Sequence, residues 1–283
     1  MRVGGRWERG SNHLPTLRLR SALALLVCVS LIWTSHAAYI SEIDLGGPHS
    51  PAGQGIELSQ VDPASDYTLL IMTADATSTA AFGLVLDTIY LPAGSGRGGV
   101  AMVTDQPWPG GGTATIPLAS TGASNSSLPL NHSRLLVLMQ GQSAVRQLDN
   151  PASEDPAAAA RYDALAVADW LVLGHGDLAS DYQNTGHDIA VINTRLGIDL
   201  LSRIVDKDGG SVIGRTNAPA QVLEMDTFFV GTPDTARQFE VAGEFLYTYT
   251  PGAANLPLTQ LPEPGSFAAL AILAGLCLRR SRR

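Results

Sequence analysis

Histidine and aspartate side chains in the second half of the sequence have the clearest capacity for chemistry. His175-Gly176-Asp177 and His187-Asp188 each place an imidazole near a carboxylate, a pairing used in general acid–base catalysis and in metal-assisted hydrolysis. A nucleophilic triad also needs an activated serine, and the sequence contains no Gly-x-Ser-x-Gly elbow. The two histidines are twelve residues apart, which matches no metal-ligand spacing with a known mechanism. We therefore interpret both clusters as loop and turn residues.

Asp206-Lys207-Asp208-Gly209-Gly210 has the aspartates and glycine of a calcium-loop start. Calcium requires several oxygen ligands, and an EF-hand loop supplies a bidentate glutamate at its twelfth position. Counted from Asp206, that position is Asn217. A tight Asp-Gly turn explains the same residues. We expect a turn here and keep calcium binding as an alternative.

The glycine-rich stretch Gly94–Gly99 has the composition of a phosphate-binding loop. A Walker loop also needs Lys followed by Ser or Thr, with a helix behind it. Here Val100 begins an expected strand instead. We therefore expect an exposed loop without a nucleotide cofactor, and the sequence predicts no other cofactor.

Trp108, Trp170 and Tyr182 would suit a sugar-stacking platform on the face of a sheet. Aromatic residues in β-sandwiches are more often core or loop anchors, because their large apolar area is worth most when buried. Carbohydrate binding stays an alternative on this pattern.

Short apolar and β-branched runs, separated by Gly and Pro, must position these side chains. In one run Ile56 and Leu58 are expected to point inward and Glu57 outward. Asp155 and Pro156 predict the N-cap and first position of a short helix that continues to residue 163. Many short strands with at most one helix predict an all-β fold, a β-sandwich. The expected strands are 39–45, 55–58, 67–72, 82–91, 100–104, 134–140, 167–173, 188–193, 198–205, 211–215, 222–229 and 245–250.

Composition excludes several classes of function for the body of the chain. Residues 38–260 hold nine basic and 24 acidic side chains, a net charge near −15. A nucleic-acid partner is disfavoured, because phosphate binding needs a basic footprint. Cys28 and Cys277 both lie outside this body, which rules out a disulfide framework, a thiol nucleophile and a cysteine-ligated zinc site within it. Packing alone must hold the fold.

Residues 1–37 have the three regions of a secretory signal peptide. Five arginines against the single acid Glu8 precede an apolar run at 21–33, and Ser35-His36-Ala37 supplies small residues before a cleavage site. The apolar run has 13 residues, fewer than the roughly 20 that a bilayer span requires. We predict export and cleavage by signal peptidase after Ala37.

The last residues form three parts in a fixed order: a Pro-Glu-Pro triplet, an apolar segment at 266–278 and a basic tail at 279–283. The triplet and the basic residues are Pro262, Glu263, Pro264, Arg279, Arg280, Arg282 and Arg283. This ending resembles the PEP-CTERM sorting signal. The resemblance implies a transmembrane helix with its arginines on the cytoplasmic side. It also implies cleavage by an exosortase, an integral-membrane protease of bacteria. A weak single-pass anchor that is retained is the alternative.

Five separated stretches carry a second resemblance: Ile40–Ile43, Ile56–Leu58, Asn184–Ile189, Asp208–Arg215 and Thr250–Asn255. In this order they resemble a lamin-tail-type domain, an immunoglobulin-like β-sandwich. The resemblance implies a cell-surface or extracellular module and brings no catalytic residues with it. Residues 105–165 exceed what such a domain needs, so we expect a long insertion there.

These patterns predict a signal peptide at 1–37, a β-sandwich domain at 38–258 and a sorting signal at 259–283. We expect a bacterial cell-surface or extracellular-matrix protein without catalytic activity, tethered transiently to the membrane by its C-terminus. Surface polysaccharide or other envelope proteins are the expected partners. The alternatives are an extracellular carbohydrate- or calcium-binding module and a secreted hydrolase on a β scaffold. The hydrolase would use acids such as Asp177, Asp188, Asp206 and Asp208.

Overall fold

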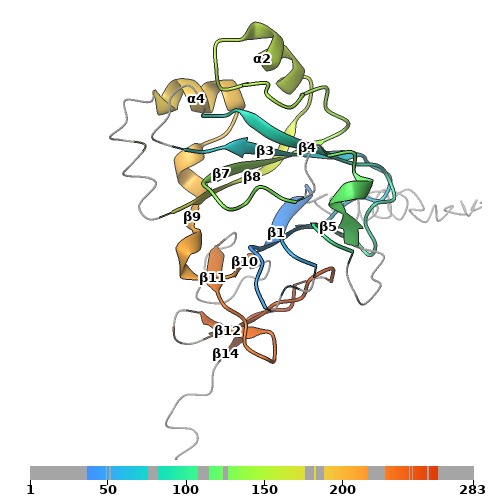
Figure 1. Ribbon diagram of the computed structural model, residues 1–283, viewed down its shortest axis with the longest axis vertical. Helices are drawn as coiled ribbons and strands as arrows, with labels where there is room; N and C mark the ends of the chain where they lie inside the picture. Colours follow the sequence, from blue (N-terminus) through green and yellow to red (C-terminus); the bar gives the residue numbers. More distant parts are fainter. Residues whose placement is uncertain are drawn as a thin grey trace, which may run out of the picture. The chain divides into compact units, whose positions relative to one another are not determined.

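Two β-sheets face each other in the body of the chain, and further elements cover the outer face of each (Figure 1). The computed structural model describes residues 37–48, 50, 52–75, 82–107, 115–123, 127–175, 182, 188–215, 227–241, 243, 245–253 and 255–260. These residues are mostly β, with three sheets and few helices, which agrees with the predicted all-β sandwich.

Sheet A has six strands, and its central strand β1 begins two residues after Ala37. Its pairs are antiparallel except for the parallel pair β5–β6. In spatial order the strands are β11 (Phe228–Gly231), β10 (Val212–Arg215), β1 (Tyr39–Asp44), β2 (Gly55–Ser59), β5 (Val100–Thr104) and β6 (Thr115–Pro117), and the 3₁₀ helix η1 (Leu118–Ser120) follows β6.

Sheet B has five strands, and its centre is formed by β3 and β7. Its pairs are antiparallel except for the parallel pair β8–β9. In spatial order the strands are β4 (Val85–Leu91), β3 (Tyr67–Thr73), β7 (Arg134–Gln140), β8 (Val167–Gly174) and β9 (Ile204–Asp206). Residues 105–165 are therefore not a simple insertion, because β7 lies between β3 and β8 and contributes to the core of the sandwich.

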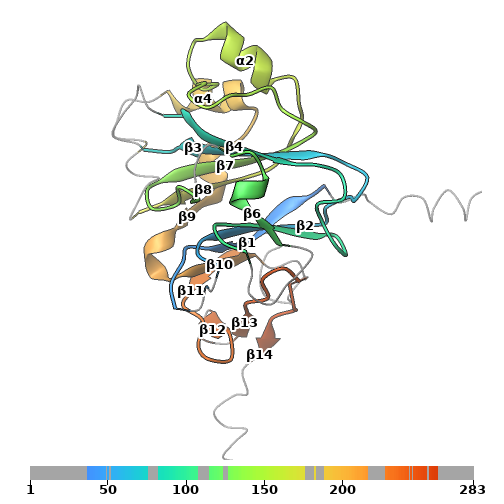
Figure 2. The same ribbon diagram turned by 45° about the vertical axis from the view of Figure 1, so that its right-hand side comes forward.

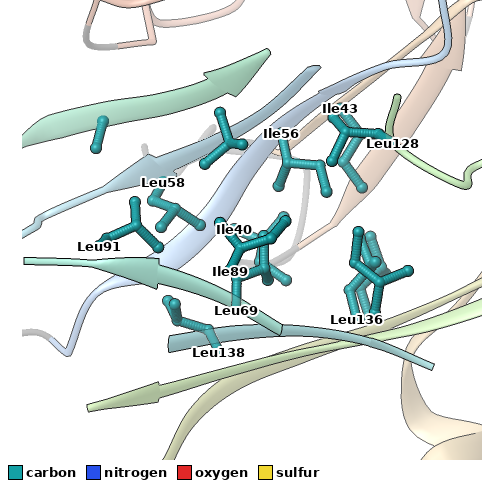
Figure 3. Packing of buried hydrophobic residues seen from close by; sticks show 14 of the residues in the cluster. Ile40, Ile43, Ile56, Leu58, Leu69, Ile89, Leu91, Leu128, Leu136 and Leu138 are labelled. Atoms are coloured by element: carbon teal, nitrogen blue, oxygen red, sulfur yellow. The ribbon is translucent and has the colours of Figure 1, made fainter. Parts of the chain in front are cut away.

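The facing sides of sheets A and B form the main hydrophobic core (Figure 3). Ile40, Ile56 and Leu58 project from sheet A toward Leu69 and Leu138 of sheet B, and all five are fully buried. Residues of one strand alternate between its two faces, so the inward residues recur with a period of two. Burying one such side chain stabilises the fold by roughly 1.5–3 kcal/mol.

The outer face of sheet B is covered by two short α-helices and a 3₁₀ helix, which are α2 (Pro156–Tyr162), α4 (Ile189–Leu196) and η2 (Leu200–Arg203). Tyr162 and Leu196 pack there against outward residues of β3 and β7. These strands are buried on both faces, which explains their continuous apolar sequences. No helix in the described part of the chain is long and apolar enough to cross a membrane.

The sequence predictions for these helices had mixed outcomes. The Asp155 side chain accepts a hydrogen bond from Ala157 N at 2.9 Å, so the predicted cap of α2 is confirmed. The predicted strand at 188–193 is wrong, because Asp188 caps α4 and the helix ends at Gly197 with φ +64°. The predicted strand at 198–205 is wrong over most of its length, where η2 replaces it.

Sheet C packs on the outer face of sheet A, and sequence analysis did not predict this third layer (Figure 2). Its three antiparallel strands are β12 (Gln238–Val241), β13 (Phe245–Thr248) and β14 (Thr259–Gln260). A separate apolar cluster joins it to sheet A through Val212 and Phe229. Glu57 does point away from the core, as predicted, yet it is fully buried because sheet C and the turn after β13 cover that face.

Asp169 of β8 connects sheets A and B through a buried ionic centre. Its carboxylate contacts Arg203 on one oxygen and Arg215 of β10 on the other, the latter at 2.8 Å. It also accepts a hydrogen bond from Ile40 N of β1 at 2.8 Å. Asp169 is 2% exposed and Arg215 is 4% exposed. The negative charge of Asp169 compensates the positive charge of Arg215, so this ion pair can be buried where it joins sheet B to sheet A.

Asp169→Ala is expected to lower the free energy of unfolding by about 3–5 kcal/mol, because it leaves buried Arg215 without its carboxylate. Denaturant unfolding measures the change. Asp149→Ala is the matched control, since it breaks the more exposed Arg161–Asp149 ion pair and should have a much smaller effect. Equal losses for the two variants would contradict this role of Asp169.

Candidate functional site: a buried carboxyl cluster under the C-terminal clasp

Three acidic side chains lie together on the outer face of sheet A, where two adjacent strands alternate between core and outer face. Glu42 and Asp44 of β1 and Glu57 of β2 are each at most 1% exposed. Glu42 pairs across the strands with Glu57, and a bulge at Ser41 interrupts the register just before this pair. The extra residue brings the Ser41 hydroxyl to Glu57 Oε1, to which it donates at 2.8 Å.

The donors that satisfy these carboxyl groups come from the C-terminal part of the domain. We call residues 245–255, which comprise β13 and the turn after it, the clasp. Tyr247 donates its hydroxyl to Glu42, and Tyr249 donates to Asp44 Oδ2 at 2.5 Å. In the turn, Thr250 N donates to Glu42 at 3.2 Å and Gly252 N donates to Glu57 Oε2 at 2.7 Å.

Asn255 closes the clasp against the backbone of two strands. Its side-chain amide donates to Ser41 O of β1 at 3.4 Å and to Arg215 O of β10 at 3.2 Å. Thr250 donates its hydroxyl to the Asn255 side-chain oxygen at 3.4 Å, which orients that amide. Both ends of the described domain are thereby tied to the same strand, β1.

Glycine residues in sheet A make room for the aromatic rings of sheet C. A Cβ atom at Gly214 would lie 2.1 Å from Cζ of Tyr247, and one at Gly231 would lie 2.2 Å from the Phe239 ring. The Phe239 and Tyr247 rings pack with their centroids 5.0 Å apart. The rings can therefore approach the sheet backbone only where a side chain is missing.

Burial dominates the protonation of the three carboxyl groups. It raises the pKa of Glu42 from the ordinary 4.5 to about 7, although hydrogen bonds from Tyr247 and Thr250 oppose the shift. Burial, together with the charge of Glu42, raises the pKa of Glu57 well above its ordinary value. Burial also raises the pKa of Asp44, against hydrogen bonds from Ser50 and Tyr249. The cluster therefore retains protons at pH values where exposed carboxyl groups have lost theirs.

The cluster is built to hold the clasp by hydrogen bonds. Within the described residues, Glu42 Oε2 is buried without a hydrogen-bond partner, a position that suits a neutral carboxyl group better than a carboxylate. No group of three His, Cys, Asp or Glu side chains that could hold a metal ion occurs in the parts of the chain that the structure describes. The arrangement supports attachment of the clasp to sheet A through hydrogen bonds to carboxyl groups.

His175 and Asp208, which sequence analysis named separately, lie together at another end of the sandwich. His175 Nδ1 contacts Asp208 Oδ1, and Nε2 lies 3.2 Å from the carbonyl oxygen of Asn131. Both ring nitrogens are therefore engaged with oxygen atoms of the protein itself. The pair orders loops in this arrangement.

Lys207 attaches to the same loop, residues 129–133, by binding its carbonyl groups. Its ammonium group donates to Leu130 O and to His132 O, the latter at 2.8 Å. Arg134 donates to the carbonyl oxygens of residues 129 and 133. Lys207 is 5% exposed, and burial, assisted by the charge of Arg134, lowers its pKa to about 8.

The predicted turn at 206–210 is confirmed as the 3₁₀ turn η3 (Lys207–Gly209). Asp206 accepts a hydrogen bond from Asp208 N at 2.9 Å, the contact expected of a turn-forming aspartate. Asp188 likewise serves as a cap, of α4. Asp188, Asp206 and Asp208, three acids of the hydrolase alternative, thus each have a separate structural contact. Asp177, His187 and Asn217 lie outside the described residues.

The described aromatic residues do not form the exposed row that carbohydrate stacking would need. Tyr182 is fully buried, donates its hydroxyl to Ala74 O at 2.7 Å and packs edge-on against Phe82. The ring of Trp170 is covered by the Arg203 guanidinium, 4.4 Å from its centroid. Trp108 lies outside the described residues.

The residues of the predicted terminal signals lie mostly outside the described chain. Pro262, Glu263, Pro264, the apolar segment and the four terminal arginines all follow Gln260, the last described residue. Ala37 is described and is exposed, two residues before β1. The predicted processing sites therefore flank the folded domain closely on both sides.

A scan against protein-family models finds no match to the chain, and searches of the curated proteins and of the solved structures find none either. Three of the five stretches named in the sequence analysis, 40–43, 56–58 and 250–255, contribute to the carboxyl cluster through Glu42, Glu57 and Gly252. Sequence analysis identified neither this cluster nor its tyrosine donors, because the partners are about 200 residues apart in the chain.

Gly214→Ala is expected to destabilise the domain by about 1–3 kcal/mol, because the new methyl group overlaps the Tyr247 ring. Denaturant unfolding measures it, and removing the ring in Gly214→Ala/Tyr247→Leu should recover part of the loss. Gly209→Ala is the matched control, since its Cβ would lie 3.5 Å from Val230, an ordinary contact. If Gly214→Ala leaves the free energy of unfolding unchanged, the Tyr247 ring does not pack against β10 at this position.

Lys207→Met should cost about 1–3 kcal/mol of unfolding free energy, because two carbonyl groups lose their donor while the apolar volume is kept. Thermal unfolding of this variant can be compared with Arg146→Met, which removes an exposed cation from a loop. If both variants unfold at the same temperature, Lys207 does not stabilise residues 129–133.

Proposed function

We propose that the chain is an exported bacterial protein of the cell surface or extracellular matrix, without catalytic activity. Its C-terminal segment would be sorted and cut by an exosortase-type membrane protease after signal peptidase has removed residues 1–37. The observation that carries the proposal is the order of Pro262-Glu263-Pro264, an apolar segment and a cluster of arginines. Arginines after an apolar segment favour retention of that end in the cytoplasm.

The internal roles of the reactive side chains support a structural or binding module. Glu42 and Glu57 hold the clasp, and Lys207 holds a loop by its carbonyl groups. We further assign the body to the immunoglobulin-like, lamin-tail-type sandwiches, and this assignment is supported by three of the five resembling stretches, which meet at one carboxyl cluster. In this proposal the module binds surface polysaccharide or another envelope protein.

The absence of cysteine between residues 38 and 260 fits this destination. The domain acquires its stability from packing and buried polar contacts, so it needs no oxidation step after export. Its net charge near −15 also favours solubility outside the membrane and disfavours contact with anionic lipid.

Mass spectrometry of the protein from its own cells, in both the envelope and the medium, tests the proposal. The expected mature form begins near Ala38 and ends close to Pro264. A predominant form that still carries Arg279–Arg283 would overturn the processing step and leave the tail as an anchor.

Replacing Pro262, Glu263 and Pro264 by Ala, Gln and Ala should block tail removal, because the proposed protease would lose its recognition motif. Intact-mass measurement and fractionation should then find the uncut chain in the membrane. Pro257→Ala, in an exposed position before β14, is the matched control and should be processed normally. Normal processing of the triple variant would contradict the assigned motif.

A further inference from the structure

The clasp is attached to a face of sheet A that the main core does not use. Its apolar contacts belong to the cluster around Tyr247 and Phe239, whereas the core between sheets A and B lies on the opposite face. Its polar contacts to β1 and β2 are the hydrogen bonds to the carboxyl cluster and to the Ser41 carbonyl group. The clasp can therefore leave sheet A without opening the sandwich.

The charges that act on the cluster are acidic. The charge of Glu42 acts on Glu57, that of Asp44 acts on Glu42, and that of Asp105, directly after β5, acts on Asp44. The titratable groups of the clasp that face the cluster are the phenols Tyr247 and Tyr249. The inward residue of neighbouring β10, Arg215, pairs with Asp169 across the main core. Ionisation of the cluster therefore brings like charges together in a buried place.

We propose that the clasp is a proton-controlled latch, which stays on sheet A while the carboxyl cluster is protonated and detaches at alkaline pH while the sandwich stays folded.

The direction of this control follows from the environment of the carboxyl groups. Burial raises the pKa of Glu42 to about 7 from 4.5, so the attached clasp binds a proton more tightly than the detached one. The attachment is fully stabilised below pH 4.5 and loses this contribution as the pH rises through 7. The pKa of Glu57 is also raised well above its ordinary value by burial and by the charge of Glu42, so this group acts in the same direction.

Detachment of the clasp would change how far the segment after residue 260 can extend from the folded body. Attached, this point is fixed by β14, which pairs with β13. Detached together with β12, its partner in sheet C, the clasp would no longer hold this point against sheet A. The latch would thus set the distance between the folded body and its C-terminal segment.

Hydrogen exchange measured by mass spectrometry on the full chain in detergent micelles tests the latch at pH 5, 7 and 9, after correction for intrinsic exchange rates. Exchange in residues 250–253, where Thr250 N and Gly252 N donate to the cluster, should accelerate by roughly two orders of magnitude between pH 5 and pH 9, as expected for one carboxyl group titrating near 7. Residues 134–140 of β7 should stay protected. Unchanged exchange in the clasp, or equal loss of protection in β7, would overturn the proposal.

A variant that cannot ionise separates the latch from general alkaline loosening. Glu42→Gln/Glu57→Gln keeps amide oxygens as acceptors, so its clasp should stay protected at pH 9. Asp62→Asn makes the same chemical change at an exposed acid and should retain the wild-type pH response. Persistence of the wild-type response in the double variant would refute the role of these two groups.

Infrared difference spectroscopy of the wild-type chain keeps the test independent of whether the double variant folds. The carbonyl stretch of a protonated carboxyl group should be present at pH 6 and lost by pH 9, in step with exchange in the clasp. Absence of this band at pH 6 would overturn the latch.

Discussion

Burying both faces of strand β1, one apolar and one acidic, is the constraint on which the rest of the structure depends. β1 presents Ile40 and Ile43 to the main core and Glu42 and Asp44 to the opposite side, and all four are buried. A buried carboxyl group without donors is costly, so sheet C must cover this face with hydroxyl and amide groups in fixed places. The glycine at Gly214 and the bulge at Ser41 follow from that need.

The domain solves the problem of a buried acid in two different ways. Asp169 is compensated by two arginines and joins the two sheets of the sandwich. The carboxyl cluster under the clasp is compensated by neutral donors and retained protons instead. Because burial raises the pKa of Glu42 to about 7, the contacts of the outer layer depend on pH near neutrality.

The same contacts connect the two ends of the described domain. Glu42 and Tyr247 are 205 residues apart in the sequence, and their hydrogen bond closes almost the whole domain into one loop. Such a contact forms only after the intervening chain has been ordered, because loop closure has an entropic cost that other contacts must offset. In the proposed export route, the outer layer is completed once both ends of the mature domain are outside the membrane.

By itself the sequence determined most strands of the two facing sheets, though not β6, and for β9 only the end of the predicted run is a strand, since alternation and β-branched residues specify a strand wherever its neighbours agree. It also determined α2 through the cap at Asp155, and a turn at Asp206–Gly210. Only the tertiary structure decided that residues 188–193 are helical, because a short run such as Ile-Ala-Val-Ile fits both periods until its packing partners are known. Periodicity places Glu57 on the face opposite Ile56, but whether that face is covered depends on residues nearly 200 positions away. The carboxyl cluster arises from such distant partners, and a local sequence pattern does not specify which distant segments will come into contact.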